Sequence, residues 1–322
     1  MKKQVVITGG LGFIGQHLVT RLIQEGFYPI IVDNLSTGRL ETLKLFHKSK
    51  FTFIKCDITK KEKLKKRLAK FKPETIIHLA AVHFIPHCNE NPIKTTLVNV
   101  SGTQILLEIA LKKNIKNFLF ASSAAVYQPK MRPHKEKDHL EPIDIYGISK
   151  KSAEEIVKFY GENTNLRFII LRIFNVYGLN NPNPHIIPRL LSQIKKSNKI
   201  KVGRLDTFRD YIYINDVTDA LMKILKSRRG FDNSIYNIGT GEKYSGYSLI
   251  KIISQIIKKR VFTYKDKNLI RKIDRKVLVS NATKFSEIYS WKPKYNIYNG
   301  LKELLGLTFT KETWAKRKNI EI

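Results

Sequence analysis

The stretch QVVITGGLGFIG, residues 4–15, decides the fold of this chain. A short apolar strand runs into Gly9, Gly12 and Gly15, and a helical pattern follows directly. Glycines at these positions allow a tight turn and let the backbone approach a pyrophosphate closely. The N-terminus of the following helix then points unpaired N–H groups at that anion. The stretch therefore predicts a dinucleotide-binding β-α-β unit at the start of the chain.

Strand-length apolar runs alternate with helix-length amphipathic segments through the first half of the chain. The expected strands are 4–8, 29–32, 51–54, 75–79, 118–121 and 168–171. The expected helices are 14–24, 60–70, 96–112 and 146–162. Nearly continuous apolar strands separated by helices are typical of a parallel sheet covered on both faces. We therefore predict an α/β fold: a Rossmann-type doubly wound parallel sheet with a smaller mixed α/β substrate-binding C-terminal part.

The regular alternation stops after Asn175, where a loop rich in Asn and Pro begins. Beyond that loop the pattern turns to short helices and isolated strands. We therefore divide the chain into an NAD-binding Rossmann domain at 1–175 and a substrate-binding domain at 176–322. Residues 208–240 are expected to return to the first domain.

The composition is strongly basic but globular. The 322 residues carry 59 Lys and Arg against 27 Asp and Glu, a formal net charge of +32. Hydrophobic residues make up 42%, which supplies a packed core and excludes a disordered basic tail. Lys provides 44 of the cations, and they are dispersed without interleaved aromatic residues. Because specific nucleic-acid contacts favour Arg forks, we interpret the lysines as solvated helix faces and predict no specific nucleic-acid partner.

Cysteine usage and hydropathy suggest the compartment. Cys56 and Cys88 are too few for a disulfide framework or a four-Cys zinc site. The N-terminal apolar run is too short for a signal peptide, and no stretch approaches the roughly 18 apolar residues of a membrane span. We expect a cytoplasmic protein with no metal site and no membrane partner.

An acidic residue indicates which dinucleotide is bound. Asp33 ends the second expected strand, 18 residues beyond Gly15. A carboxylate there accepts hydrogen bonds from the adenosine ribose hydroxyls and repels a 2′-phosphate, which favours NAD over NADP. Asp57 follows the third expected strand, where it either faces the adenine edge or caps a helix N-terminus.

A Tyr-Lys pair and a serine indicate the catalytic site. Tyr146 and Lys150 are four residues apart at the start of an expected helix, so both lie on one face. A nearby ammonium lowers the pKa of a phenol, which makes a tyrosine a usable base near neutral pH. Ser122 and Ser123 close the fifth expected strand, at the carboxyl edge of the sheet where ligands bind. A hydroxyl there can hydrogen-bond the same substrate oxygen as the tyrosine.

These motifs resemble those of the extended short-chain dehydrogenases/reductases, in particular the NAD-dependent nucleotide-sugar epimerase/dehydratase family and its UDP-glucose 4-epimerase-like members. The resemblance covers nearly the whole chain. The segments that carry it are TGGLGFIG at 8–15, DNLSTG at 33–38, HLAA at 78–81, SSAAVY at 122–127, YGISK at 146–150, LRIFNVYG at 171–178, RDYIYINDV at 209–217 and YNIGTG at 236–241.

The resemblance implies NAD as cofactor, a nucleotide-diphosphate sugar as substrate, and Ser123, Tyr146 and Lys150 as the catalytic residues. It also implies a homodimer through a bundle that includes the helices 96–112 and 146–162. The expected cofactor contacts are Gly9, Gly12, Phe13, Ile14, Gly15, Asp33, Asn34, Asp57, Ile58, Leu79, Ala80, Ala81, Asn99, Tyr146 and Lys150. The expected substrate contacts are His83, Ser123, Asn175, His185, Arg209, Arg271 and Asp274, of which the two arginines are forks suited to a diphosphate.

One departure from the family's pattern bears on the chemistry. Ala124 and Ala125 follow Ser123 where the dehydratases of this family carry Asp-Glu and the decarboxylases carry Glu. A 4,6-elimination needs an acid and a base, and two alanines supply neither. Transient oxidation followed by re-reduction, or a simple reduction, remains.

We therefore expect NAD-dependent epimerisation, most simply at C4 of a UDP-hexose, by transient oxidation to a 4-keto sugar and re-reduction. Two alternatives stay open. An NAD(P)H-dependent reductase of a GDP- or CDP-linked 4-keto-6-deoxy sugar shares every motif, and residues 202–207 resemble the GDP- or CDP-sugar branches. A dinucleotide-sensing protein that binds nucleic acid through its basic surface is the non-enzymatic alternative.

Overall fold

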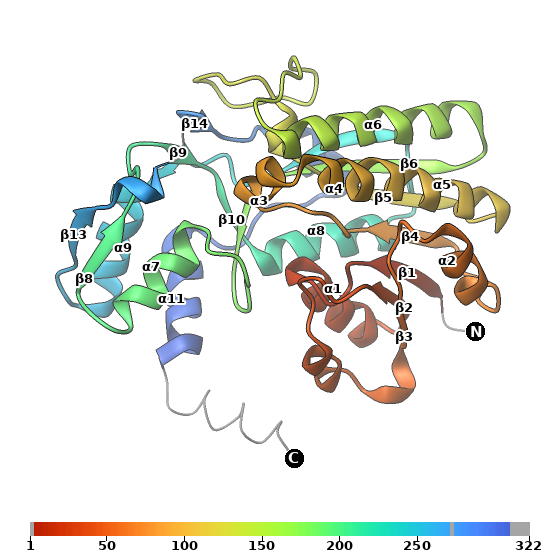
Figure 1. Ribbon diagram of the computed structural model, residues 1–322, viewed down its shortest axis with the longest axis horizontal. Helices are drawn as coiled ribbons and strands as arrows, with labels where there is room; N and C mark the ends of the chain where they lie inside the picture. The colour runs from red at the N-terminus through yellow and green to blue at the C-terminus, as the bar shows by residue number, and fades with distance from the viewer. Residues whose placement is uncertain (1–2, 271–273, 310–322) are drawn as a thin grey trace.

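A seven-stranded, wholly parallel sheet forms the centre of the molecule in a computed structural model that describes residues 3–270 and 274–309 (Figure 1). The strand order is β11-β6-β5-β4-β1-β2-β3, which confirms the predicted Rossmann-type doubly wound sheet. The strands are β1 (Gln4–Thr8), β2 (Tyr28–Asp33), β3 (Thr52–Lys55), β4 (Thr75–His78), β5 (Asn117–Ser123), β6 (Arg167–Ile173) and β11 (Ser234–Ile238). The strand order reverses between β1 and β4, and ligands of such sheets bind at that point.

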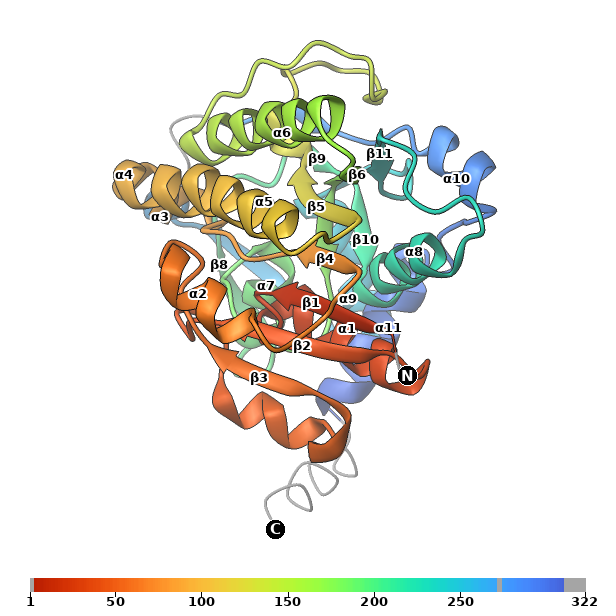
Figure 2. The ribbon, with the colours of Figure 1, turned by 90° about the vertical axis from the view of Figure 1, so that its right-hand side faces the viewer.

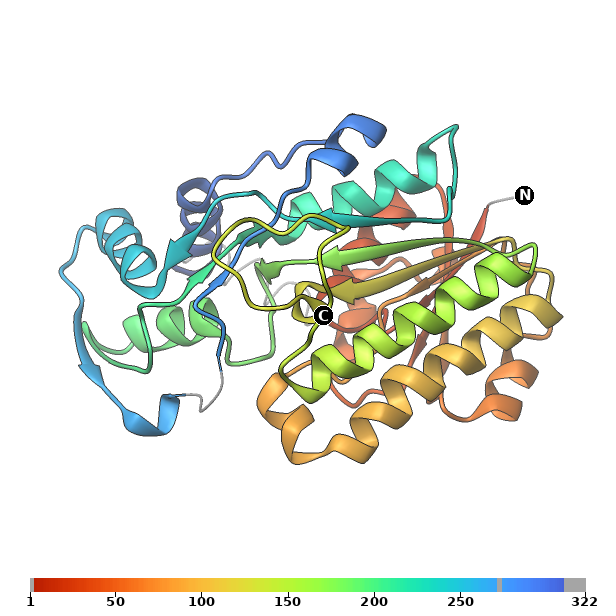
Figure 3. The same cartoon turned by 90° about the horizontal axis from the view of Figure 1, so that it is seen from above.

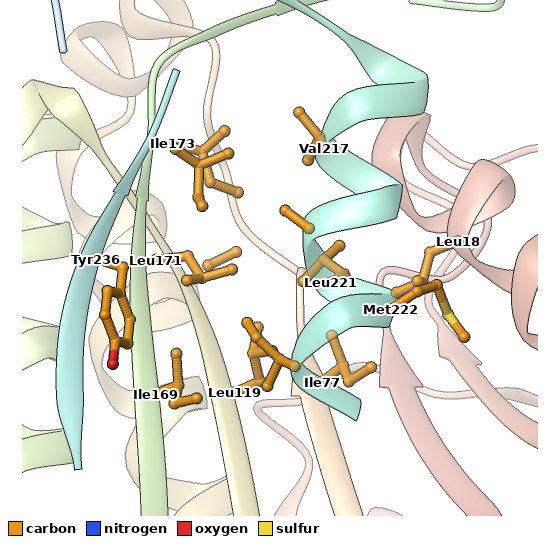
Figure 4. Packing of buried hydrophobic residues seen from close by; sticks show 14 of the residues in the cluster. Leu18, Ile77, Leu119, Ile169, Leu171, Ile173, Val217, Leu221, Met222 and Tyr236 are labelled. Atoms are coloured by element: carbon orange, nitrogen blue, oxygen red, sulfur yellow. The ribbon is translucent and has the colours of Figure 1, made fainter. Parts of the chain in front are cut away.

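Helices cover both faces of this sheet (Figure 2). One face carries α1 (Phe13–Gln24), α8 (Ile214–Lys226) and α10 (Thr283–Tyr289). The other carries α2 (Lys61–Leu68), α5 (Gly102–Lys112) and α6 (Ile145–Asn163). Figure 4 shows Leu221 of α8 facing Leu119 and Leu171 of the sheet, with Leu18 of α1 beside Met222 of α8. Because both faces are buried, the strands are apolar throughout instead of alternating.

The helical segment expected at 96–112 begins earlier than predicted. It starts with α4 (Pro92–Thr96), passes through one π-helical turn at Leu97–Ser101, and continues as α5. Pro92 is well placed at the start, since the first turn of a helix needs no N–H from that residue. A short helix, α3 (Ile85–Glu90), precedes it.

A smaller part with its own apolar core stands beside the sheet at the carboxyl ends of its strands (Figure 3). Its strands form three small sheets: β7 (Asn175–Tyr177) with β10 (Tyr211–Tyr213), β9 (Phe208–Arg209) between β12 (Tyr244–Ser245) and β14 (Val277–Leu278), and β8 (Lys199–Val202) with β13 (Phe262–Lys265). Its helices are α7 (Ile186–Ile194), α9 (Gly246–Ile257) and α11 (Ile297–Phe309).

The chain passes between the two parts more than once. β11 pairs with β6 in the main sheet, and α8 packs on that sheet, whereas β9 and β10 belong to the small sheets. The division at 1–175 and 176–322, with 208–240 returning, stays a prediction. No helix within residues 3–270 and 274–309 is long and apolar enough to cross a membrane.

Candidate active site

The carboxyl ends of β1, β4 and β5 open into a cavity of about 1160 Å³ between the main sheet and the smaller part. The glycine-rich turn and the loops after β2 and β4 line one end of it. Side chains of β7, α7 and the 201–209 segment line the other end. The cavity is therefore long enough to take two ligands that meet near β5.

The turn before α1 fits a pyrophosphate. A Cβ on Gly15 would lie 2.2 Å from the carbonyl oxygen of Gly9, so only glycine allows the helix to start this close to β1. Gly12 is the N-cap of α1, and no side chain caps the helix. The first N–H groups of α1 have no partner within the helix. They lie at this end of the cavity, where an anion can accept hydrogen bonds from them.

Asp33 ends β2 and is 7% exposed. Its Oδ2 accepts from the Leu11 N–H at 3.0 Å and its Oδ1 from the Leu35 N–H at 2.8 Å. Burial raises the pKa of Asp33 from its ordinary value, and these two hydrogen bonds oppose the rise. Each oxygen keeps a second lone pair for a ribose hydroxyl. The residues present therefore fit the adenosine end of NAD.

The structure brings nearly all the predicted cofactor residues to this end of the cavity. The lining includes Gly9, Gly12, Phe13, Ile14, Gly15, Asp33, Asn34, Asp57, Ile58, Leu79, Ala80 and Ala81. Asn99 is the exception, because it is buried behind the wall. Its side chain accepts from the Val82 N–H at 2.8 Å and donates to the Val82 carbonyl at 2.9 Å. These bonds hold the loop after β4, and the role of Asn99 as a cofactor contact stays a prediction.

Tyr146 lies in the first turn of α6, and a capped helix end positions it. Asp144 is the N-cap and accepts from the Gly147 N–H at 2.8 Å. A Cβ on Gly147 would lie 2.3 Å from the Ala125 carbonyl oxygen, so this glycine lets α6 approach the turn after β5. The approach brings Tyr146 close to Ser123.

Ser123 and Tyr146 both line the cavity, close enough for the Ser123 hydroxyl to influence the phenol. Burial raises the pKa of Tyr146 above its ordinary value, and the Ser123 hydroxyl opposes that rise. Ser123 Oγ also accepts from the Ala125 N–H at 3.1 Å, which fixes the hydroxyl at the end of β5. The following Ala124 and Ala125 are buried, and no carboxylate stands at either position.

Lys150 is buried one turn after Tyr146 on the same helix. Its Nζ lies 4.3 Å from the centroid of the Phe120 ring. Burial lowers the pKa of Lys150 to about 7, although the Glu154 carboxylate pulls it upward. This ammonium is therefore poised to gain or lose its proton near neutral pH.

A buried ion pair lies one further turn along α6, and the sequence patterns did not reveal it. Glu154 is fully buried and accepts from Arg172 Nη2 at 2.6 Å and from Arg172 Nε at 3.0 Å. Ser122 Oγ donates to the same carboxylate. Ser122 and Arg172 are direct neighbours on β5 and β6, so Glu154 joins α6 to both strands beside Ser123.

Arg275 is a second residue that the sequence patterns missed. It is 5% exposed, and it donates from Nη1 to Asp144 Oδ2 at 3.1 Å and from Nη2 to the Ala125 carbonyl at 2.8 Å. It thereby ties the start of α6 to the turn that follows Ser123. The one available signal was its position next to Asp274 in a predicted substrate segment.

Polar side chains of the smaller part form the substrate end. Arg209 Nη2 donates to Asp274 Oδ1 at 2.5 Å, which orients its guanidinium at the cavity wall. Asn175, at the start of β7, lines the same wall. Arg271, the other predicted diphosphate contact, lies outside the described residues.

Two predicted histidines meet across the cavity. His83, after β4, has its Nε2 2.8 Å from the side-chain amide of Asn183. Its ring centroid lies 6.4 Å from that of His185, which precedes α7. Both rings line the cavity, and burial lowers the pKa of His83. In residues 3–270 and 274–309 no three His, Cys, Asp or Glu side chains are grouped to hold a metal ion.

Comparison with known proteins agrees with this geometry. The model of the NAD dependent epimerase/dehydratase family matches residues 5–239. The chain is 33% identical to a putative UDP-glucose 4-epimerase of Methanocaldococcus jannaschii, over 98% of this chain and 99% of that protein. It superposes on the UDP-glucose 4-epimerase of Thermotoga maritima, solved with UDP-glucose, with a TM-score of 0.87, 28% identity and coverage of 98% and 99%. For the Thermus thermophilus UDP-glucose 4-epimerase in complex with NAD, the TM-score is 0.85, with 27% identity and coverage of 94% and 97%.

The chain belongs to the NAD-dependent epimerase/dehydratase family of extended short-chain dehydrogenases/reductases. It is an NAD-dependent enzyme that epimerises a nucleotide sugar. The non-enzymatic alternative is therefore set aside, and the predictions of fold, enzyme class and cofactor are confirmed.

Proposed function

We propose that this enzyme inverts C4 of a UDP-hexose, with Ser123, Tyr146 and Lys150 as its catalytic residues. The observation that carries the proposal is the pair Ala124 and Ala125, buried directly after Ser123. An elimination would need an acid and a base beside the catalytic hydroxyl. With alanines there, the site lacks the carboxylates of a dehydratase. It keeps the tyrosine, lysine and serine that the exchange of a proton and a hydride at one carbon requires.

The chain's own residues move the proton. Tyr146 takes the proton of the C4 hydroxyl and returns it, and Ser123 hydrogen-bonds the same oxygen and aligns it. The Lys150 ammonium, when protonated, lowers the pKa of Tyr146 against the effect of burial. When bound, NAD supplies the hydride acceptor and donor for a transient 4-keto sugar. The Gly9–Gly15 turn and Asp33 would hold its pyrophosphate and ribose.

The diphosphate of the substrate is assigned to the Arg209 end of the cavity. The Asp274 carboxylate and the Phe208 carbonyl hold the Arg209 guanidinium at the cavity wall, and the planar fork of a guanidinium suits phosphate oxygens. Asn175, His83 and His185 line the space between this end and Tyr146, where the hexose would lie. The uridine assignment rests on the similarity to UDP-glucose 4-epimerases.

A panel of sugar nucleotides tests the proposal. Purified enzyme with NAD is incubated with UDP-, GDP-, CDP- and dTDP-hexoses, and NMR resolves the products. We expect interconversion of C4 epimers of a UDP-hexose without net change in absorbance at the reduced-nicotinamide band. Stoichiometric loss of that absorbance with a 4-keto-6-deoxy sugar would establish the reductase instead, and a panel left wholly unchanged would refute both.

We also propose a homodimer, formed through α4, α5 and α6. These helices lie side by side on the outer face of the sheet (Figure 2). These helices and the π turn between α4 and α5 expose large apolar side chains: Ile93 is 85% exposed and Phe159 62%, and Leu97 and Ile148 are about half exposed. A cluster of such residues on one surface is typical of a subunit contact. A cytoplasmic location stays a prediction, supported by Cys56 and Cys88, which are both free thiols.

A further inference from the structure

One end of the molecule concentrates positive charge. The segments 195–204 and 251–267 together contain 11 Lys and Arg but a single acidic residue, Asp266. They hold about a fifth of the chain's cations in 27 of its 322 residues. Far apart in the sequence, the two segments are brought together because β8 and β13 pair in parallel. We call this surface, formed by residues 195–204 and 251–267, the basic tip.

Parallel pairing also aligns the flanking residues. Phe262 N–H donates to the Asn198 carbonyl at 2.7 Å, so both strands begin at the same edge of the small sheet. The pair Lys195-Lys196 before β8 and the run 258–260 before β13 therefore gather at that edge. The cations at 258–260 are exposed and, with Lys251 of α9, border a shallow surface depression. In Figure 1 this end, with β8, β13 and α9, lies opposite the end that carries α2.

Aromatic side chains lie among these cations, which the sequence analysis did not foresee. Phe262 is paired with Lys199 and Tyr264 with Lys201, and the two rings are 44% and 49% exposed. The Arg260 guanidinium lies 5.1 Å from the Phe262 ring centroid, and Lys201 Nζ lies 6.0 Å from that of Tyr264. Cross-strand pairing, invisible in the linear sequence, creates this alternation.

We propose that the basic tip docks the enzyme on an anionic lipid bilayer. The inference goes beyond the proposed reaction and does not depend on the sugar that is epimerised. Clustered Lys and Arg attract anionic headgroups, and partly exposed Phe and Tyr rings are suited to the interface between headgroups and acyl chains. Charge complementarity thus selects a bilayer that carries acidic lipid.

A single-stranded nucleic acid is the competing polyanion, and the geometry favours the bilayer. Binding of single strands needs a basic groove with free aromatic faces on which bases stack. Here cations already lie against the rings of Phe262 and Tyr264, and the depression beside them is shallow. A surface without a deep groove suits a flat bilayer better than a single-stranded nucleic acid.

Vesicle sedimentation with the full-length, NAD-loaded enzyme tests the proposal. The probes are vesicles of phosphatidylcholine alone and vesicles with about 30 mol % phosphatidylglycerol, each at low salt and at about 0.15 M salt. We expect binding to the acidic vesicles, weakened by salt, and none to phosphatidylcholine. Absence of binding to acidic vesicles at low salt would overturn the proposal.

A matched pair of variants locates the surface. The tip variant carries Lys258→Gln, Lys259→Gln, Arg260→Gln and Lys265→Gln. The control variant carries Lys63→Gln, Lys66→Gln and Arg67→Gln on exposed positions of α2 and Lys70→Gln just after it, and removes the same number and kind of charges. We expect the tip variant to lose at least about 100-fold in vesicle affinity, and the control less than about 10-fold. Equal losses in both would show general attraction by the net charge and refute the tip as a docking site.

Activity and melting temperature of the charge variants, and vesicle binding of an aromatic variant, distinguish loss of docking from loss of folding. Both variants should retain the wild-type epimerase activity and melting temperature, because none of the eight residues lines the cavity. Phe262→Ser with Tyr264→Ser should weaken vesicle binding at unchanged charge. If single-stranded RNA instead binds through the same four cations while acidic vesicles do not, the tip is a nucleic-acid site and the bilayer proposal is wrong.

Discussion

Tyr146 and Lys150 owe their chemistry to the depth at which α6 places them. Burial moves the two pKa values in opposite directions, because each neutral form is favoured in a poorly solvated site. The phenol becomes a weaker acid and the ammonium a stronger one. The two pKa values, which are close together in water, therefore move apart, so that burial favours a protonated phenol beside a neutral amine before cofactor and substrate bind.

Removal of the phenolic hydroxyl should stop the proposed reaction while leaving the cofactor bound. We expect Tyr146→Phe to lower kcat by at least about 100-fold, the usual range for the loss of a positioned acid-base group. Tyr247→Phe, at an exposed tyrosine outside the cavity, is the control and should leave kcat unchanged. Product formation by NMR and NAD content by absorbance are measured on the same samples. Full activity of Tyr146→Phe would remove Tyr146 from the mechanism.

The lowered pKa of Lys150 should appear in the pH dependence of stability. Between pH 7 and about 10.4 the unfolded chain holds a proton on this lysine that the folded chain has lost. The unfolded state binds more protons, so stability rises with pH by up to about 1.4 kcal/mol per unit. Urea unfolding of NAD-free protein at about pH 7.5 and 9.0 should show the wild type gaining about 2 kcal/mol more than Lys150→Met. Equal gains in the two proteins would mean an ordinary lysine pKa.

Residues such as Arg275 and Glu154 show the limit of sequence patterns at this scale. Tyr146, Lys150 and Ser123 stand in motifs at recognisable spacing. Arg275 and Glu154 are charged residues in a chain rich in charge, and nothing local distinguishes a buried cation or carboxylate from a solvated one. Their partners lie 131 and 18 residues away. Only the fold makes these pairs visible.

At the scale of elements, α6 carries two proposed catalytic residues and a buried carboxylate on one face. Tyr146, Lys150 and Glu154 follow at intervals of four and so lie on one face. The last of them joins α6 to β5 and β6 through Ser122 and Arg172. The helix is thus anchored at both its capped start and its middle, which holds Tyr146 on the same side of the cavity as Ser123.

Breaking this anchor should cost stability. Glu154→Gln leaves the Arg172 guanidinium buried without a counter-charge, so we expect a loss of about 3–5 kcal/mol in the free energy of unfolding. Glu155→Gln is the matched control on the next residue, because it removes only an exposed pair with Lys158 and should cost less than about 1 kcal/mol. Urea unfolding with NAD present measures both. A small loss for Glu154→Gln would show that the pair is not a structural anchor.

The main elements were predictable, and the small ones were not. Every expected strand of the main sheet is present within two residues of its predicted ends, since long apolar runs carry a clear pattern. The sheet of β9, β12 and β14 is built from strands of two residues, too short to show any period. No sequence pattern likewise indicates the π turn at Leu97–Ser101. Tertiary pairing, not local preference, forms these pieces.

For the whole molecule, the outer face of α4, α5 and α6 determines the expected assembly. Ile93→Glu with Phe159→Glu places charge on the proposed contact, and the burial of a charge without a partner is costly. We expect the wild type to elute as a dimer and this variant as a monomer in size exclusion with light scattering. Tyr298→Glu, at an exposed residue of α11, is the control and should leave the dimer intact. A monomeric wild type would refute the homodimer.

The way the chain joins its two parts has a consequence for turnover. Phe174 is the single residue between β6 and β7, and β10 continues into α8 without any intervening residue. Connections this short keep the two walls of the cavity close together at these points of the chain. In the proposed C4 cycle, an oxidised sugar formed inside would then stay in the cavity until it is reduced, and release of free ketone to the medium would be rare compared with completed cycles.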